Sequence, residues 1–587
     1  MRIRYNRKTH FYYSGKNTTV ELSVLLVKIK KKTFPRKVMN FNELLNLVSS
    51  DNAPNICIDS RAIGAGDIFV AVKGTVYDGH DFIDQAIANG AEYIVSQKDK
   101  SSIEHRVSSI ETVIVDDSAE ATGGSLKQVP KYWDALGDGL QTSSIETVIV
   151  DDSAEAAAVL AQASRGNPAS QLTNLAVTGT NGKTTVAYLV RSCIQKAGQK
   201  CGLLGTVIYD TCSGESCEAA LTTPDCLTIA AGQEQMLKNG AKYMVIEASS
   251  HALSQNRLTG INFKAAAFTN LAGDHLDYHK TEEDYLAAKT RLFSALSPDA
   301  VAVLNKLSPQ AELIAKQTDA KILWYAIAPT AGLRQQAVGA DITAHIESMD
   351  MSGTVFTLKY ADQSSIVKTF LLGLYNVSNC LAAAGLCLAA GFDLETIAAG
   401  LSAQQTIPGR LEKIDWPGDF SVIIDYAHTD DALKNVLSTL KPLCRGKLRV
   451  VFGCGGDRDK TKRPRMARVT EQLADFIIVT SDNPRTEKPD DIISNIVSGF
   501  ETAPPVKNSD LRDTKYEVRD MKIIEPDRKK AIELAIRKAG KDDIVLIAGK
   551  GHETYQIIGK QKFDFSDKQI AGECLKKRII SKELTVY

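Results

Sequence analysis

Short apolar runs alternate with longer amphipathic runs along most of this chain. An apolar run of about four to eight residues between turn residues is typical of a buried strand, and apolar positions about 3.6 residues apart are typical of a helix. Their regular alternation predicts parallel sheets with helices on both faces. In the middle of the chain, where a more β-like stretch at 342–360 interrupts it, the pattern covers 172–198, 242–250, 264–271, 299–305 and 376–391.

The pattern predicts three domains of the α/β class. Residues 55–74 indicate short strands separated by glycine turns, and residues 80–95 indicate a helix ended by Gly90 and then a strand. Apolar strands return at 420–428, 448–456, 475–485 and 542–551. We therefore expect a small N-terminal α/β domain at 39–170, a central domain with a parallel sheet at 171–414, and a doubly wound α/β domain at 415–587.

The first 38 residues fall outside this pattern. Residues 1–38 hold 11 Lys or Arg and one acidic residue, Glu21, and a natural-looking start follows at Met39. The segment is Lys-rich rather than Arg- and Ser-rich, so it resembles a transit peptide only in its charge. We expect a disordered or targeting extension, or an upstream start, that takes no part in the fold.

A perfect repeat also falls outside the pattern. The stretch SSIETVIVDDSAEA occurs at Ser108–Ala121 and again at Ser143–Ala156, 35 residues later. Solenoid repeats diverge and come in larger numbers, so two identical copies indicate a duplication or a gene-model error rather than architecture. The second copy runs directly into a helical pattern, and we expect it to supply the native strand. Residues 108–142 are then an insertion in the N-terminal domain.

The composition narrows the class of protein. The 587 residues include 70 Lys+Arg and 70 Asp+Glu, so overall charge favours neither nucleic acid nor membrane as a partner. The longest apolar runs, such as 543–549, are far shorter than a membrane span. The 11 cysteines show no metal-binding spacing and fit free thiols in a reducing compartment. We expect a monomeric cytoplasmic protein, with organelle import through the basic N-terminus as the alternative.

The stretch 177–186, VTGTNGKTTV, has the form of a phosphate-binding loop. Glycines between a strand and a helix let backbone N–H groups approach an anion at the positive end of the helix dipole. The usual motif has a glycine where this chain has Val177, but the strand before and the helix after restore the match, so the central domain is P-loop-like. The residues expected to contact nucleotide are Gly179, Thr180, Asn181, Gly182, Lys183, Thr184 and Thr185.

Further motifs make the chain similar to a known family. With the glycine loop, the stretches EASSHAL, FTNLAGDHLDYH, NVSN, PGR and DYAHTDDAL resemble the Mur ligases, at 247–253, 268–279, 376–379, 408–410 and 425–433. The stretches TTPD, DNPR and GKGHE resemble the MurE type of that family, at 222–225, 482–485 and 549–553. The resemblance covers about residues 50–575 in the family's order. One departure is Asp430, where the family commonly has proline, and we expect it to have little effect.

The resemblance implies an ATP-dependent ligase of peptidoglycan precursor synthesis. ATP would convert the D-glutamate carboxylate of UDP-N-acetylmuramoyl-L-Ala-D-Glu to an acyl phosphate, and the amine of meso-diaminopimelate would then attack it. Charge builds on phosphate oxygens in such a reaction, so cations and Mg²⁺ should dominate catalysis. The implied catalytic residues are Lys183, Glu247, His275 and Lys289, and the implied Mg²⁺ ligands are Thr184, Glu247, His275 and Lys289.

Two of these residues read differently without the family. Lys289 lies in a clear helical pattern at 282–293 and would be taken as a surface lysine. In the Mur ligases the matching lysine is carbamylated by CO₂, which converts a cation into an oxygen ligand suited to Mg²⁺. His275 alone would be taken as a hydrogen-bonded loop histidine. Glu247 stands at the carboxyl end of an apolar strand, where ligand sites form in such sheets.

The remaining implied roles divide between nucleotide and substrate. Adenine, ribose and phosphates would be met by Asn379, Arg410, Asp425 and His428, and the UDP-muramoyl dipeptide by Ser60, Thr222, Thr223, Ser249 and Arg257. Diaminopimelate has a distal carboxylate that L-lysine lacks, and arginine is the natural bidentate partner of a carboxylate. The residues assigned to this amino acid are Arg458, Asp482, Asn483, Arg485, Gly549 and Glu553.

Other interpretations stay open at this point. A lysine-adding ligase of the same type is the close enzyme rival, and a folylpolyglutamate synthetase would leave DNPR and TTPD unexplained. From another class, an inactive MurE-like scaffold protein in a plastid fits the basic N-terminus. The presence of Lys183, Glu247, His275, Lys289 and Arg485 argues against the scaffold.

The repeat yields a first prediction. Deleting Ser108–Thr142 removes one 35-residue period and leaves one copy of the repeated stretch. Because two identical segments cannot occupy one strand position, the deletion should leave soluble expression, Tm and ligase activity unchanged. Loss of soluble protein or of activity would show that the extra segment belongs to the fold.

Overall fold

The computed structural model describes residues 10–15, 18–23, 39–97, 145–328, 339–502, 505–508 and 521–585. The chain divides into two compact units, Met1–Leu160 and Ala161–Tyr587. In the part of the chain that the structure describes, no helix has the length and apolar character needed to cross a membrane.

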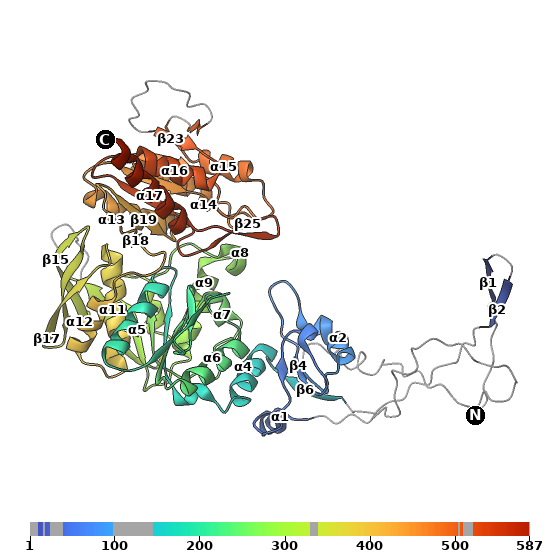
Figure 1. Ribbon diagram of the computed structural model, residues 1–587. Coiled ribbons are helices and arrows are strands. Elements are labelled where there is room, and N and C mark those ends of the chain that lie inside the picture. The colour runs from blue at the N-terminus through green and yellow to red at the C-terminus, as the bar shows by residue number, and fades with distance from the viewer. Residues whose placement is uncertain are drawn as a thin grey trace. The chain divides into compact units, whose positions relative to one another are not determined.

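The first unit contains a small parallel sheet. Its described strands pair in the order β3 (Ile56–Cys57), β4 (Ile68–Val70), β5 (Tyr93–Gln97) and β6 (Glu146–Val150), and α1 (Phe41–Val48) and α2 (Ile83–Ala88) flank it. Strand β6 comes from the second copy of the repeat and leads into α4 (Ser153–Ala163), as predicted (Figure 1). The first copy and residues 122–142 lie outside the described residues.

The N-terminal extension contains one pair of strands. Within 1–38, β1 (His10–Gly15) and β2 (Thr18–Ser23) pair in antiparallel fashion, which the sequence analysis did not predict. The strands HFYYSG and TTVELS are rich in aromatic and β-branched residues, which favour the extended backbone. The count of basic residues concealed this local β preference.

The second unit begins with a large twisted sheet. Among the described residues it has 11 strands, in the order β10-β9-β8-β11-β7-β12-β13-β14-β15-β16-β17. All neighbouring strands from β8 to β15 along this order are parallel. At one end of the sheet β9 and β10 are antiparallel. At the other end β15–β17 form an antiparallel meander, at the β-like stretch predicted from the sequence. The bounds are β7 (Thr173–Thr178), β8 (Cys201–Leu204), β9 (Ile208–Asp210), β10 (Ser216–Glu218), β11 (Tyr243–Glu247), β12 (Phe263–Phe268), β13 (Val301–Asn305), β14 (Lys321–Ile327), β15 (Ile342–Asp350), β16 (Gly353–Tyr360) and β17 (Gln363–Thr369).

Helices cover both faces of this sheet (Figure 1). Leu175 and Val177 of β7 pack into one apolar cluster, and Ala176 packs into the other, as strand alternation requires. The first cluster includes α5 (Lys183–Lys196), α11 (Leu374–Ala389) and α12 (Leu394–Ala403). The second includes α6 (Cys226–Lys238), α7 (Ser250–Ser254), α9 (Glu282–Ser294) and α10 (Ala311–Ala315), and the short α8 (Leu276–His279) precedes α9.

A second α/β domain follows and is doubly wound, as predicted. Its described sheet has the order β18-β19-β24-β20-β21-β23-β22, parallel except for β18. The strands are β18 (Glu412–Lys413), β19 (Ser421–Asp425), β20 (Leu448–Phe452), β21 (Phe476–Val479), β22 (Val506–Lys507), β23 (Met521–Ile524) and β24 (Ile544–Ala548).

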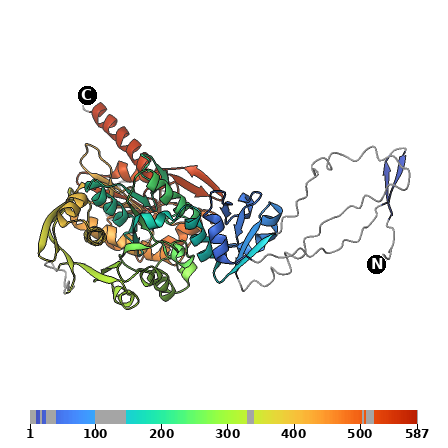
Figure 2. The ribbon, with the colours of Figure 1, turned by 90° about the horizontal axis from the view of Figure 1, so that it is seen from below.

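Helices again take opposite faces of this sheet. One face carries α13 (Asp430–Leu440), α14 (Lys462–Leu473) and α15 (Pro489–Val497), and the other carries α16 (Arg528–Lys538) and α17 (Asp567–Thr585), whose end projects from the domain (Figure 2). A separate hairpin, β25 (Tyr555–Ile558) with β26 (Gln561–Asp564), follows β24.

Candidate active site

Three strand ends of the large sheet meet at one edge. Strand β7 pairs in parallel with β11 on one side and β12 on the other, with Val177 opposite Glu247 and Thr178 opposite Phe268. The glycine loop follows β7, so it lies between the ends of β11 and β12. This is the position at which parallel α/β sheets bind ligands.

The two loop glycines are required by close packing. Gly179 has φ 148°, and a Cβ there would lie 1.9 Å from the hydroxyl of Thr269. Gly182 has φ 91°, and a Cβ there would lie 2.3 Å from Oδ1 of Asn379. The loop is further held by the backbone N–H of Asn181, which donates to Asn270 Oδ1 at 3.0 Å. Its shape is therefore set by the protein itself.

Two lysines, the half-buried Lys183 and the buried Lys289, contact the loop carbonyls. The ammonium of Lys183 donates to the carbonyls of Gly179 (2.8 Å) and Thr180 (2.9 Å), and that of Lys289 donates to Gly179 at 2.9 Å. Burial lowers the pKa of Lys183, and burial together with repulsion from Lys183 lowers the pKa of Lys289 well below its ordinary value. Lys289 is 1% exposed and lies 4.4 Å from the ring centre of Tyr285, so the surface-lysine interpretation is wrong.

Glu247 is a buried carboxylate surrounded by donors. It accepts hydrogen bonds from the hydroxyl of Thr184 (3.0 Å) and from both the backbone N–H (2.8 Å) and the hydroxyl (2.9 Å) of Thr206. The sequence analysis missed Thr206. It follows β8, which pairs in parallel with β11, so the rule that strand ends gather at one edge also applies to this residue.

His275 lies beside these groups, in the loop after β12. Its backbone is left-handed, with φ 57°, and its ring packs 4.9 Å from that of His251. The side chain of His275 is 45% exposed. Desolvation of the ring, with repulsion from His251, Lys183 and Lys289, lowers its pKa, against the opposing charge of Asp274. The imidazole is therefore neutral at neutral pH, the form that binds metals.

The donor set suits Mg²⁺ with water and phosphate oxygens. Thr184, Glu247 and His275 line one cavity. In the described residues, no three His, Cys, Asp or Glu side chains form a metal cluster of their own. Mg²⁺ is usually held by one or two protein ligands plus substrate phosphates, so these residues fit the ion.

That cavity has a volume of about 430 Å³ and is lined by both domains of the second unit. The predicted nucleotide residues Asn379, Arg410, Asp425 and His428 all line it. The guanidinium of Arg410 lies 4.6 Å from the ring centre of Tyr426 and donates to Thr184 at 3.1 Å. Its buried Nε has no hydrogen-bond partner among the described residues, as expected for a group that binds an anion.

Asp425, which was predicted to contact nucleotide, also accepts hydrogen bonds from the protein backbone. Asp425 accepts the backbone N–H groups of Leu411 (2.7 Å) and Ala427 (2.8 Å), and burial raises its pKa. Burial lowers the pKa of His428 to about 4. Between the domains, Asn181 of the loop donates to Asp431 at 3.0 Å, which the sequence analysis did not predict.

The predicted dipeptide residues of the second unit form one cluster beside Glu247. The hydroxyl of Thr223 donates to the backbone carbonyl of Glu247 (2.6 Å), and Thr223 and Ser249 hydroxyls lie 3.0 Å apart. Arg257 donates to the carbonyl of Thr223 at 2.7 Å, and the hydroxyls of Thr206 and Thr222 lie 3.1 Å apart. Ser60 lies in the first unit, where its buried hydroxyl donates to Gln85 at 2.9 Å.

The predicted amino-acid residues also come together, beyond the carboxyl ends of β21 and β24. Asn483 donates to Glu553 Oε2 at 2.9 Å, and a Cβ at Gly549 would lie 2.6 Å from Asp482 Oδ2. Arg485 donates to the carbonyl of Gly456 at 2.8 Å. Burial and the nearby charge of Arg458 lower the pKa of Arg485. Guanidinium groups are the side chains best suited to bind a carboxylate through two parallel hydrogen bonds.

The charge-rich stretch 457–465 contains one half of an ion pair, a fully buried arginine. Arg463 is completely buried and donates to both oxygens of Glu487 (2.9 and 3.0 Å), while Glu487 also accepts from the backbone N–H of Asp457 at 2.7 Å. This pair ties the loop of Arg458 to the loop of Arg485. The sequence analysis missed it because Glu487 is distant along the chain.

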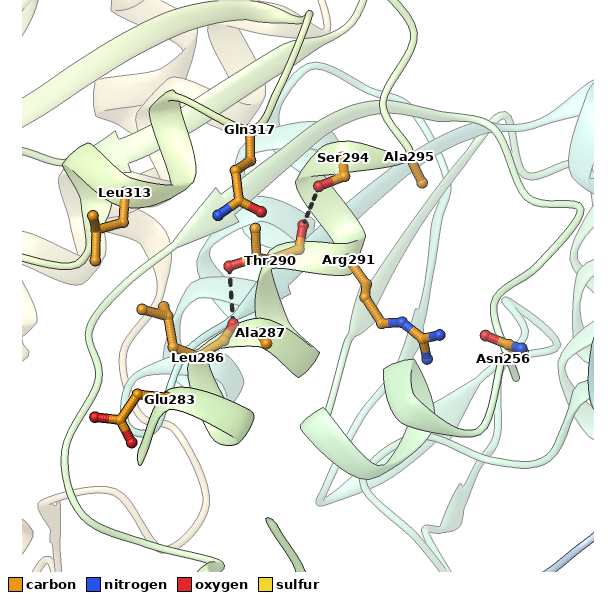
Figure 3. Close-up of a pocket in the computed structure, with 10 residues that line it drawn as sticks. All are labelled: Asn256, Glu283, Leu286, Ala287, Thr290, Arg291, Ser294, Ala295, Leu313 and Gln317. Atoms are coloured by element: carbon orange, nitrogen blue, oxygen red, sulfur yellow. Dashed lines mark hydrogen bonds between the residues drawn. The ribbon is translucent and has the colours of Figure 1, made fainter. Parts of the chain in front are cut away.

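A second hollow, of about 530 Å³, lies on the face of α9 that carries Thr290, Arg291 and Ser294. The hydroxyls of Thr290 and Ser294 donate to carbonyls of their own helix (Figure 3). Arg291 donates to the carbonyls of Leu253 and Ser254. The hollow has no convergent unsatisfied groups among these residues, so we place the reaction in the smaller cavity.

The fold and this cavity, which has a glycine loop and a lining from two α/β domains, are typical of a nucleotide-dependent enzyme. Family models match the chain in three places: the Mur ligase family catalytic domain at 53–138, the Mur ligase middle domain at 177–387, and the Mur ligase glutamate ligase domain at 409–551. The chain belongs to the Mur ligase family, the ATP-dependent acid–amino-acid ligases of peptidoglycan precursor synthesis.

Individual relatives agree over nearly the whole length. UDP-N-acetylmuramoyl-L-alanyl-D-glutamate--2,6-diaminopimelate ligase of Geobacillus kaustophilus is 39% identical over 527 residues, 89% of this chain and 94% of its own length. The protein of the same name from Gloeobacter violaceus is 39% identical and covers 92% and 99%. A solved structure of a protein with this name is 29% identical, with a TM-score of 0.57 and coverage of 92% and 99%.

Proposed function

We propose that this protein ligates meso-diaminopimelate to the D-glutamate carboxylate of UDP-N-acetylmuramoyl-L-Ala-D-Glu at the expense of ATP. The observation that carries the proposal is the approach of two arginines to one glycine: a Cβ at Gly455 would lie 2.8 Å from Arg485 Nη1 and 3.9 Å from Arg458 Cγ. With Glu553, whose charge acts on Arg485, these groups would offer two cations and one anion to the distal end of the amino acid. Diaminopimelate ligase relatives at 39% identity support it. The proposal keeps the expectation of a monomeric, cytoplasmic enzyme.

The central cavity would carry out activation of the carboxylate. An oxygen of the substrate carboxylate attacks the terminal phosphorus of ATP, the bond to ADP breaks, and an acyl phosphate results. Lys183, Arg410 and the loop N–H groups face the phosphate charge, and Thr184, Glu247 and His275 would hold Mg²⁺. Bound there, Mg²⁺ neutralises phosphate charge. Walls from two domains exclude water from the acyl phosphate.

The second half of the reaction needs an amine presented from the C-terminal domain. The substrate amine, after losing a proton, attacks the acyl carbon, and phosphate leaves as the amide forms. Glu553 would receive the distal ammonium, and Arg485 the distal carboxylate. Holding this distal centre orients the reacting amine, since a bound and aligned nucleophile avoids most of the entropic cost of a bimolecular step.

The proposal is tested by ATP turnover with the UDP-muramoyl dipeptide, comparing meso-diaminopimelate with L-lysine. Phosphate release that depends on diaminopimelate and gives the tripeptide product by mass spectrometry is the expected result. A preference for L-lysine would show that the protein is a ligase of this type that adds L-lysine instead of diaminopimelate. No turnover with either amino acid would favour the scaffold interpretation.

We also propose that Lys289 is carbamylated. Its amine is buried beside Gly179 and Tyr285, and an uncharged amine is the form that adds to CO₂, losing a proton as the N–C bond forms. The product would be an anionic oxygen donor beside Gly179 of the glycine loop, of the kind Mg²⁺ prefers.

Lys289→Ala should lose nearly all activity, and a short-chain carboxylic acid or high bicarbonate should restore part of it by supplying oxygens to the vacated space. The exposed Lys316→Ala is the matched control and should behave as wild type. A ¹³C NMR carbamate signal from ¹³CO₂ should be present in wild type and missing in Lys289→Ala. Full activity of the unassisted variant would return Lys289 to a packing role.

Arg485 decides the choice of amino acid. Arg485→Ala removes one partner of a charge pair worth about 2–5 kcal/mol, so kcat/KM with diaminopimelate should fall roughly 30- to several-thousand-fold. Turnover with L-lysine, which has no distal carboxylate, should fall much less or rise from a low baseline. Arg485→Lys should rescue poorly because an ammonium lacks the two-pronged geometry.

The control for Arg485 is Arg468→Ala, which removes an exposed arginine paired with Glu501 on the same domain. It should change kcat/KM little for either amino acid. Equal losses for diaminopimelate and L-lysine in Arg485→Ala would assign Arg485 to loop structure and take away the main physical support for diaminopimelate.

A further inference from the structure

One buried cation of the C-terminal domain has no part in the mechanism above. Lys550 follows β24, between Gly549 and Gly551, and is completely buried. Its ammonium lies 2.8 Å from Glu553 Oε2, 3.0 Å from Asn483 Oδ1 and 3.8 Å from Asp482 Oδ1. A lysine removed from water is costly unless it is paired in this way.

Lys550 fixes the orientation of the Asn483 amide. An ammonium only donates hydrogen bonds, so the amide atom facing it must be the oxygen. The backbone N–H of Ile557 donates to the same oxygen at 2.9 Å. The NH₂ end of Asn483 is therefore turned to Glu553, to whose Oε2 it donates at 2.9 Å.

The same contacts select one oxygen of Glu553. Both Lys550 and Asn483 bind Oε2, so within the described part of the chain Oε1 is the oxygen left for a ligand. The side chain of Glu553 is 14% exposed, enough to reach a ligand while its rotamer stays restrained. A carboxylate held in this way is pre-organised for a single ammonium.

Lys550 also sets the local charge. Asp482 and Glu553 supply two carboxylates, and Lys550 supplies one ammonium. Arg528 lies close by but is already paired with Asp567, at 2.7 and 2.8 Å. Burial alone would raise the pKa of Asp482, but the charges of Lys550 and Arg528 outweigh it and leave the pKa below its ordinary value. Among Asp482, Glu553 and Lys550 alone, one net negative charge remains.

We propose that Lys550 is a positioning residue for the amino-acid substrate, holding Asn483 and Glu553 so that Glu553 Oε1 receives the distal ammonium. This inference rests on the proposed function. Loss of Lys550 should weaken the binding of substrates that have the distal ammonium, whereas loss of Arg485 should weaken the binding of substrates that have the distal carboxylate. The two residues can therefore be separated by the choice of amino acid.

The test compares Lys550→Met with Lys562→Met, which removes an exposed lysine over the ring of Tyr555 without contacting either carboxylate. The probes are meso-diaminopimelate, L-lysine and 2-aminopimelate, which keeps the distal carboxylate but lacks the ammonium. Supporting side chains of this kind are worth roughly 10- to 100-fold where they orient a binding group. In Lys550→Met, KM should rise by that factor for both diamino acids.

Three readouts separate positioning from general damage. The KM for ATP and the kcat at saturating amino acid should stay near wild type in Lys550→Met, and the KM or inhibition constant of 2-aminopimelate should change little. Lys562→Met should match wild type throughout. Equal losses for 2-aminopimelate and diaminopimelate, or kinetics equal to those of Lys562→Met, would overturn the inference while wild-type activity upholds the proposed function. An inactive wild type would remove both.

A second variant tests the inference if Lys550→Met does not fold. Lys550→Met/Glu553→Gln keeps the local charge of the wild type and should remain soluble even where Lys550→Met does not. If Lys550 acts through Glu553, the double variant should have the same KM for diaminopimelate as Glu553→Gln alone, because the two losses are not additive. A further tenfold rise in the double variant would contradict a role through Glu553.

Discussion

The parallel register of β7 with β11 and β12 is the constraint on which the site depends. It brings the glycine loop, Glu247 and the loop of His275 to one edge of the sheet. Polar groups gathered at such an edge lose water and must satisfy one another. The hydroxyls around Glu247 and the carbonyl of Gly179 between two lysines meet that requirement, so the cavity is built before any ligand enters.

Much of this architecture could be predicted from the sequence because its causes are local. Apolar periodicity places the strands and helices, and the end of an apolar strand places Glu247 at the sheet edge. The role proposed for Lys289 could not be predicted from local sequence patterns. The helical pattern around Lys289 predicts an exposed side chain. Only the family resemblance indicated a functional group there, and the side chain is 1% exposed.

The residues missed by the sequence analysis share a physical reason. Arg463 and Lys550 stand among polar residues and glycines, where a cation is usually solvated. Their burial depends on carboxylates brought from other segments, Glu487 for one and Asp482 for the other. The pairing of residues 10–15 with 18–23 was missed for a simpler reason, because the sequence analysis considered the charge of this segment and not its local preference for extended backbone.

The left-handed backbone of Arg485 links the stability of this loop to the identity of its side chain. Its φ is 50°, and its N–H and C=O bond to Ile557 and Gly559, so the hairpin imposes a left-handed conformation that costs a non-glycine residue about 1 kcal/mol or more. Glycine or asparagine would relieve that strain. Replacing Arg485 by either residue would therefore relieve backbone strain and at the same time remove the guanidinium. The strain at this position opposes the stabilisation from the side chain's hydrogen bond to Gly456.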